Sequence, residues 1–297
     1  VKAYEVDPVT GEVLRDKPLW SASYLLGDDP SNQNTDWPET PYWSKRSYED
    51  REIATYDPDK EEGVAFRFTT ISEDQKDSLD ADEIIAERKL DYLRGDNTYE
   101  EQNDGTFRER YSKLGDIVHS APLYHGYEIT GGTDTDAFGV VYVGGNDGML
   151  HAFYAGISKT DPENGKELFA FVPNRVFPNL SSLTLAYYNH KFFVDATPHV
   201  RDMTDGDGTD KILVGGLGRG GRGYFALDVS DPKNNTEANA DQWVLWEYPR
   251  ASTDSAKIDH MGFSYSQPVV VKSNDRSHPW VVIFGNGYDS PSQCASL

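Results

Sequence analysis

The pattern of apolar and polar positions changes character along the chain. Near the N-terminus, short apolar runs at residues 3–6, 19–22 and 51–56 are typical of β-strands. The stretch Asp7-Pro8-Val9-Thr10-Gly11 predicts a turn, because proline presets φ and glycine readily adopts a positive φ. We therefore expect a strand, a turn and a second strand at the start of the chain.

A small helical insertion is predicted near residues 72–95. Ser72 and Asp80 each begin a stretch with an N-cap residue and acidic residues in the first turn. Apolar residues then recur at roughly helical spacing up to Leu93, and Gly95 is a typical C-cap. The polar segment 96–112 is expected to loop back to a sheet.

From Gly115 onward the pattern is that of short β-strands, and its landmarks repeat in a fixed order. Each unit has an X-Pro pair, a β-run ending in glycine, and, where the unit is complete, a second strand and a last strand ending in proline. The glycines at 144, 215 and 285 are separated by 71 and 70 residues. Four strands per unit is the construction of a propeller blade. Because common blades have roughly 40 to 50 residues, the additional residues are expected in loops between strands.

We therefore predict a mainly all-β fold, a partial or modified β-propeller with four-stranded blades. Residues 1–114 are interpreted as a diverged blade or a lead-in segment that carries the helical insertion. Residues 115–297 are interpreted as propeller repeats, with blades at about 115–175 and 190–250 and an incomplete blade at 260–297. The alternative is a β-sandwich whose hairpins are similar by coincidence.

The residues of these repeats resemble the PilC/PilY type IV pilus biogenesis and tip-associated adhesin family. The resemblance is carried first by residues 115–122 and 141–153. It continues, in the family's order, through residues 169–173, 193–195, 213–223, 226–232 and 284–288, with further similarity at 18–22 and 91–96. One element is generic, since the motif around Gly144 is also close to the blade signature of quinoprotein (PQQ) propellers.

The resemblance implies a modified seven-bladed propeller in a large secreted protein at the cell surface or the pilus tip. It implies a non-enzymatic role in pilus assembly, retraction control, adhesion and twitching motility. The implied partners are pilin subunits or minor pilins, and host or surface ligands. We expect the chain to be a fragment, because it opens in mid-pattern without an initiating methionine, and we expect the export signal outside it.

The composition of the chain limits the classes of partner that it is expected to bind. The chain has 50 acidic and 28 basic residues and a formal net charge of -22, which disfavours binding to nucleic acid or to an anionic membrane surface. Acidity fits an extracellular or cation-binding protein, and equally an ordinary soluble one. The single cysteine, Cys294, excludes an intrachain disulfide and a cysteine-based zinc site. No apolar run reaches the roughly 20 residues needed to span a bilayer.

The loop from Asp202 to Asp210 holds the sharpest candidate site, a calcium site formed by Asp205, Asp207, Thr209 and Asp210. Alternating acids in a glycine-bearing loop can direct several oxygens at one Ca²⁺. The match to an EF-type loop is partial, because counting from Asp205 places Gly216 where that loop has its bidentate acid. A solvated acidic turn between strands is the alternative.

Three other features have structural explanations. The glycine-rich stretch 215–223 is followed by a strand rather than a helix, which favours a hairpin turn over a phosphate loop, with Arg219 and Arg222 as exposed contacts for an acidic partner. Residues 146–148, Asn-Asp-Gly, predict a hairpin turn. His119 and His151 lie in β-runs and are expected to be core or blade-packing residues.

Two alternative functions remain for a propeller of this kind. A quinoprotein-like dehydrogenase would need a cofactor site at the ring axis, often with Ca²⁺ and a vicinal disulfide that one cysteine cannot form. A generic protein-binding scaffold needs neither. The sequence contains no Gly-x-Ser-x-Gly nucleophile elbow, and we expect no enzyme activity.

Overall fold

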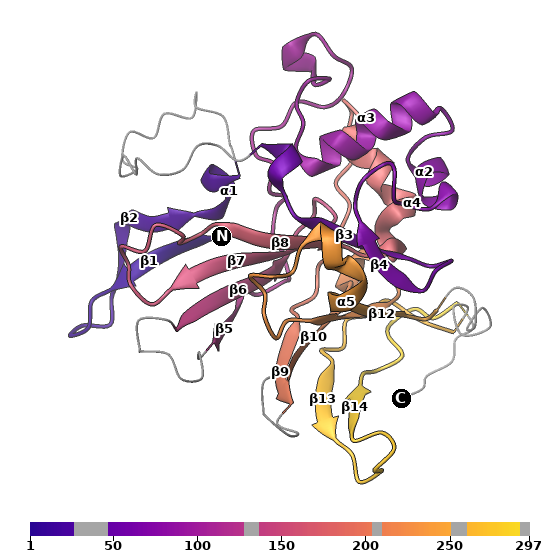
Figure 1. The fold of residues 1–297 in the computed structure, drawn as a ribbon. Coiled ribbons are helices and arrows are strands. Elements are labelled where there is room, and N and C mark those ends of the chain that lie inside the picture. The colour runs from indigo at the N-terminus through magenta and orange to yellow at the C-terminus, as the bar shows by residue number, and fades with distance from the viewer. Residues whose placement is uncertain (27–46, 128–136, 204–209, 251–259, 292–297) are drawn as a thin grey trace.

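The computed structural model describes residues 1–26, 47–127, 137–203, 210–250 and 260–291 (Figure 1). Its strands form a six-stranded sheet, a four-stranded sheet and two hairpins. This arrangement confirms the mainly β fold and the four-stranded blades, and the sheets formed by the described residues do not close into a ring. No helix in the described part of the chain is long and apolar enough to cross a membrane.

The first blade is an antiparallel meander of four strands. Its strands are β5 (Leu123–Tyr127), β6 (Phe138–Gly144), β7 (Leu150–Gly156) and β8 (Glu167–Val172). Two earlier strands extend the same sheet, because β3 (Ile53–Asp57) pairs in parallel with β8, and β4 (Glu62–Ala65) pairs with β3. The division of the chain at residue 114 stays a prediction.

The second blade repeats the meander, and the third unit begins it. The second blade consists of β9 (His199–Met203), β10 (Asp210–Gly216), β11 (Tyr224–Asp228) and β12 (Val244–Tyr248). The hairpin β13 (Val269–Lys272) and β14 (Trp280–Ile283) follows. The strands β6 and β10 contain Gly144 and Gly215, and β14 ends two residues before Gly285, so the spacing in the sequence is the spacing of blades.

Apolar clusters stack these units face to face. The N-terminal hairpin of β1 (Lys2–Val6) and β2 (Val13–Ser21) places Trp20 against Val143 and Phe153 of the first blade. The rings of Phe171 and Phe225 meet between the first two blades, with centroids 5.1 Å apart. A third cluster joins the second blade to β13 and β14. The order hairpin, blade, blade, hairpin is visible in Figure 1.

The helical insertion is confirmed as α2 (Glu73–Leu79) and α3 (Glu83–Arg94). Ser72 and Gln75 form a capping box, and Gly95 ends α3 with a φ of 121°. The remaining helical segments are short: α1 (Ala22–Leu25), α4 (Phe177–Leu180), α5 (Ala240–Trp243) and 3-10 turns at Tyr48–Asp50, Glu101–Asn103, Asn174–Val176, Ser181–Thr184, Gly218–Gly220 and Glu237–Asn239.

Buried ion pairs fasten the N-terminal segment to both blades. Arg51 binds Glu167 of β8 through two hydrogen bonds of 2.8 and 2.9 Å, and its third nitrogen donates to the backbone oxygen of Arg94. Arg94 in turn pairs with Glu237, which lies beside the second blade, at 2.7 Å. Arg51, Glu167 and Arg94 are almost fully buried, so each depends on its partner to offset the loss of water.

Candidate functional site

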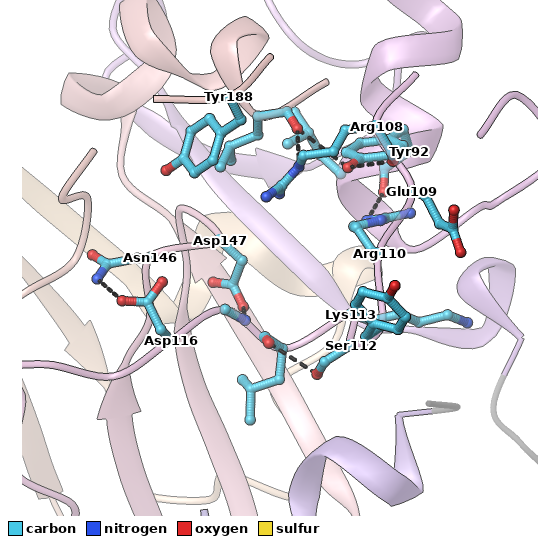
Figure 2. Close-up of a pocket in the computed structure, with 15 residues that line it drawn as sticks. Tyr92, Arg108, Glu109, Arg110, Ser112, Lys113, Asp116, Asn146, Asp147 and Tyr188 are labelled. Carbon is cyan, nitrogen blue, oxygen red and sulfur yellow. Dashed lines mark hydrogen bonds between the residues drawn. The ribbon is translucent and has the colours of Figure 1, made fainter. Parts of the chain in front are cut away.

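A polar pocket of about 200 Å³ lies where α3, the segment 108–116 and the turn between β6 and β7 come together (Figure 2). The turn contributes Asn146 and Asp147, and Tyr188 closes the opposite side. The pocket therefore combines residues from the helical insertion, from the first blade and from the link to the second blade.

The floor of the pocket is the hairpin turn predicted at residues 146–148, and the structure confirms this turn. Asp147 accepts hydrogen bonds from the backbone nitrogens of Gly115 at 2.6 Å and Met149 at 3.1 Å. Asn146 donates to Asp116 at 2.9 Å and accepts from the backbone nitrogen of Phe193 at 3.0 Å. The turn thus holds two distant chain segments in place and gives the pocket a rigid floor.

The opposite wall is formed by Arg108 and Tyr188. The Nε of Arg108 donates to the backbone oxygen of Leu183 at 3.1 Å, and its guanidinium lies 4.4 Å from the centre of the Tyr188 ring. Within the described residues, no carboxylate forms an ion pair with Arg108. A guanidinium held in this way can bind a carboxylate through two parallel hydrogen bonds.

Arg110, by contrast, has a structural role. It pairs with the buried Glu100 at 2.7 Å, donates to the backbone oxygens of Tyr92 and Asp96, and lies 3.5 Å from the centre of the Tyr92 ring. These contacts fix the segment 96–110 against α3 and leave Arg108 as the cation on this segment with no carboxylate partner in the described structure.

A buried network of ion pairs inside the blade supports the floor of the pocket. His151 lies between Asp147, at 3.1 Å, and Glu167, at 2.8 Å. Burial alone lowers the pKa of His151, but the two carboxylates overcome this effect and raise it to about 9. Burial likewise acts to raise the pKa of Glu167, and Arg51 and His151 hold it well below its usual value. The prediction that His151 is a packing residue is confirmed.

His119 is not a core residue, and that prediction is wrong. It lies in a bend before β5 with 54% of its side chain exposed, and its Nδ1 is 2.6 Å from the buried carboxylate of Asp195. A second pair, His190 with Asp116 at 2.9 Å, lies beside the pocket. The strand β5 begins only at Leu123, after residues 115–122, so His119 lies outside the sheet.

The candidate calcium loop lies almost entirely outside the described residues. Of its four predicted ligands, Asp205, Asp207 and Thr209 fall in the range 204–209, and Asp210 is the exposed first residue of β10. In the parts of the chain that the structure describes, no group of three or more histidine, cysteine or acidic residues is placed to hold a metal ion. The calcium site stays a prediction.

The glycine-rich stretch forms the end of β10, a short 3-10 turn and the start of β11, which confirms a hairpin. Arg222 is 3.6 Å from the carboxylate of Asp289. Arg219 is exposed and lies 4.6 Å from the centre of the Phe192 ring. The Arg108 pocket has no counterpart among the sites predicted from the sequence, because its residues come from separate segments.

Comparison with known proteins decides the family. Residues 115–296 match the family model described as the PilY1 beta-propeller domain. The chain belongs to this family. Two relatives are a "Type IV pilus biogenesis factor PilY1 homolog" of Xylella fastidiosa, 34% identical over 99% of this chain, and the "Type IV pilus biogenesis factor PilY1" of Pseudomonas aeruginosa, 39% identical over 71% of it.

The chain spans only about a fifth of the length of these PilY1 relatives, 21% and 18% respectively. Among solved structures, it is similar to the Pseudomonas aeruginosa PilY1 C-terminal domain, at 35% identity over 53% of this chain and 26% of that one, with a TM-score of 0.37. Because the family model covers residues 115–296 and the chain spans about a fifth of its relatives, the family assignment concerns the propeller part of longer proteins, and it agrees with the repeats read from the sequence.

Proposed function

We propose that this chain is the propeller part of a type IV pilus biogenesis factor and acts in pilus assembly as a non-enzymatic binding protein. The observation that carries the proposal is the match of residues 115–296 to the PilY1 propeller family, together with two relatives named as type IV pilus biogenesis factors. These findings favour the pilus role over the quinoprotein alternative, because the family model and both relatives are PilY1 proteins.

The geometry supports a binding role rather than a catalytic one. The pocket presents an arginine and tyrosines on a rigid floor, and these residue types dominate the energetic centres of protein interfaces. Two of its three carboxylates already have protein partners, Asp147 with His151 and Asp116 with His190, and the third, Glu109, points away from the cavity. The site is therefore built to hold a partner group in place.

The finer parts of the proposal concern the whole protein. We infer an extracellular position at the cell surface or the pilus tip, with pilin subunits or minor pilins as partners. Retraction control, adhesion to host or surface ligands, and twitching motility belong to the same proposal. They follow from the family resemblance, and the acidic character of the chain is compatible with them.

A domain exchange tests the proposal. In Pseudomonas aeruginosa PilY1, the segment aligned with this chain is replaced by this chain, and the chimera is expressed in a strain that lacks PilY1. Because the two share 39% identity over 230 residues, we expect the chimera to fold and to restore pili. The readout is the amount of pilin sheared from the cell surface, relative to the native protein and the empty strain.

The exchange needs a control for folding. The same segment carrying Phe225→Asp, which places a charge between the two blades, is expected to reduce protein level and surface pilin together. A chimera that accumulates at the native level, resists protease as PilY1 does and yet leaves the cells without pili would refute the proposed function.

A further inference from the structure

We propose that the Arg108 pocket is a docking site for an extended acidic segment of a protein partner, with a carboxylate bound by Arg108. The inference rests on the proposed function only for the identity of the partner as a pilus component. It concerns the chemistry of recognition, which neither the family match nor the names of the relatives specify.

Arg108 is held in position without a carboxylate partner in the described structure. In a chain with 50 acidic and 28 basic residues, most buried or half-buried arginines have a carboxylate partner, as Arg51, Arg94 and Arg110 do. Arg108 has none among the described residues, yet a backbone oxygen and the Tyr188 ring hold its guanidinium in place. An arginine that is already positioned loses little conformational entropy when it binds a ligand.

The charges around Arg108 also favour an acidic partner. Figure 2 shows the Arg108 guanidinium beside the Tyr188 ring, facing the space above the turn at Asn146 and Asp147, and Glu109 directed away from that space. Of the three acidic residues that line the pocket, Asp116 and Asp147 are bonded to histidines, and the third, Glu109, is the one directed away. The unsatisfied charge that the pocket presents is therefore positive.

Exposed tyrosines lie at the rim of the pocket. Tyr111 lines the pocket with 79% of its surface exposed, and Tyr187, next to Tyr188, is 96% exposed. Exposed tyrosines beside an arginine supply apolar contact area at low entropic cost and are typical of interface centres. A partner that places a carboxylate on Arg108 would cover these rings.

The surface continues from the pocket to a second cation. The His190 ring, paired with Asp116, lies 4.9 Å from the Phe192 ring, which supports Arg219 at 4.6 Å. No carboxylate in the described structure pairs with Arg219. Two supported arginines along one surface fit an extended segment with at least two acidic residues, and this is the occupant we infer.

The test uses the purified chain and a fluorescein-labelled peptide, Gly-Tyr-Glu-Gly-Glu-Gly, followed by fluorescence anisotropy. The comparison peptide replaces both glutamates by glutamine and so keeps the shape and removes the charge. We expect the acidic peptide to bind the native chain at least about tenfold more tightly than the glutamine peptide, because hydrogen bonds to charged groups are the strong ones.

The variants locate the binding. Arg108→Gln is expected to weaken binding of the acidic peptide by about tenfold or more, and Arg219→Gln by a smaller factor. The matched control is Arg88→Gln: Arg88 also lies 4.4 Å from a tyrosine ring, that of Tyr99, but it is on α3 outside the pocket. Its replacement should leave binding unchanged.

Three results would overturn the inference: equal binding of the two peptides by the native chain, no binding of either, or equal losses in Arg108→Gln and Arg88→Gln. The comparison of peptides on the native chain decides the question even if a variant fails to fold. Failure of the inference is separable from failure of the proposed function: a chimera with Arg108→Gln that restores full piliation removes the docking role, and leaves the pilus role intact.

Discussion

Replacing Glu167 by glutamine removes the carboxylate that holds both Arg51 and His151 inside the first blade. The side chains of Glu167, Arg51 and His151 are 0, 2 and 1% exposed, and Glu167 contacts Arg51 at 2.8 and 2.9 Å and His151 at 2.8 Å. The change leaves a buried guanidinium without its counter-charge. Removal of one partner of a buried ion pair costs about 3–5 kcal/mol, and we expect a loss of that size in the free energy of unfolding.

The same network makes the stability of the native protein depend on pH. The pKa of His151 rises from 6.5 to about 9 on folding, so its contribution is fully present below pH 6.5 and is lost as the pH rises through 9. At 1.36 kcal/mol per pKa unit, this loss amounts to about 3 kcal/mol. The pKa of Glu167 is lowered, so its contribution is present above pH 4.5 and is lost in acid. The network therefore stabilises most between about pH 4.5 and 6.5.

Urea unfolding followed by tryptophan fluorescence, at pH values from 6 to 9, measures both effects. The matched control is Glu163→Gln, the same substitution in a half-exposed pair with Lys166 at 2.9 Å, which should cost no more than about 1 kcal/mol. A cost for Glu167→Gln no larger than that for Glu163→Gln, or a native protein as stable at pH 9 as at pH 6.5, would refute the stabilising role of this network.

Three further predictions concern separate parts of the molecule. Burial raises the pKa of Glu247 to about 8, so its contribution to stability is present below pH 4.5 and is lost as the pH rises through 8. Glu247→Gln should therefore reduce the fall in melting temperature between pH 5 and 8, and an unchanged fall would contradict this. Calcium calorimetry should give a binding heat that Asp205→Ala and Asp207→Ala abolish, and equal heats in all three proteins would end the calcium hypothesis. Ser72→Ala removes the capping box of α2 and should lower the free energy of unfolding by about 1 kcal/mol in urea titrations; no loss would show that the cap is not needed.

The features that the sequence predicts correctly are those with a local signal. The repeating glycines, the turn at Asp147 and the caps of α2 and α3 each depend on a few neighbouring residues. Their geometry is fixed by φ preferences and by hydrogen bonds within a few positions. The blade pattern and the helical insertion could therefore be predicted without knowledge of the tertiary structure.

The features that could not be predicted depend on contacts between distant residues. One such contact is the parallel pairing of β3 with β8. Another is the ion pair of Arg51 with Glu167, which are 116 residues apart in the sequence. The Arg108 pocket combines α3, a loop, a hairpin turn and Tyr188, and none of these segments carries a motif for it. The apolar context of His119 predicts burial. In the structure its side chain is exposed and pairs with Asp195, a contact that the local sequence does not reveal.

The proposal that this propeller serves pilus assembly is tested most directly by one measurement: surface pilin on cells whose PilY1 carries this chain in place of its own propeller segment. The account predicts surface pilin close to that of cells with native PilY1, and well above that of cells without PilY1. Stable, exported chimera on cells that shear no more pilin than the strain without PilY1 would contradict it.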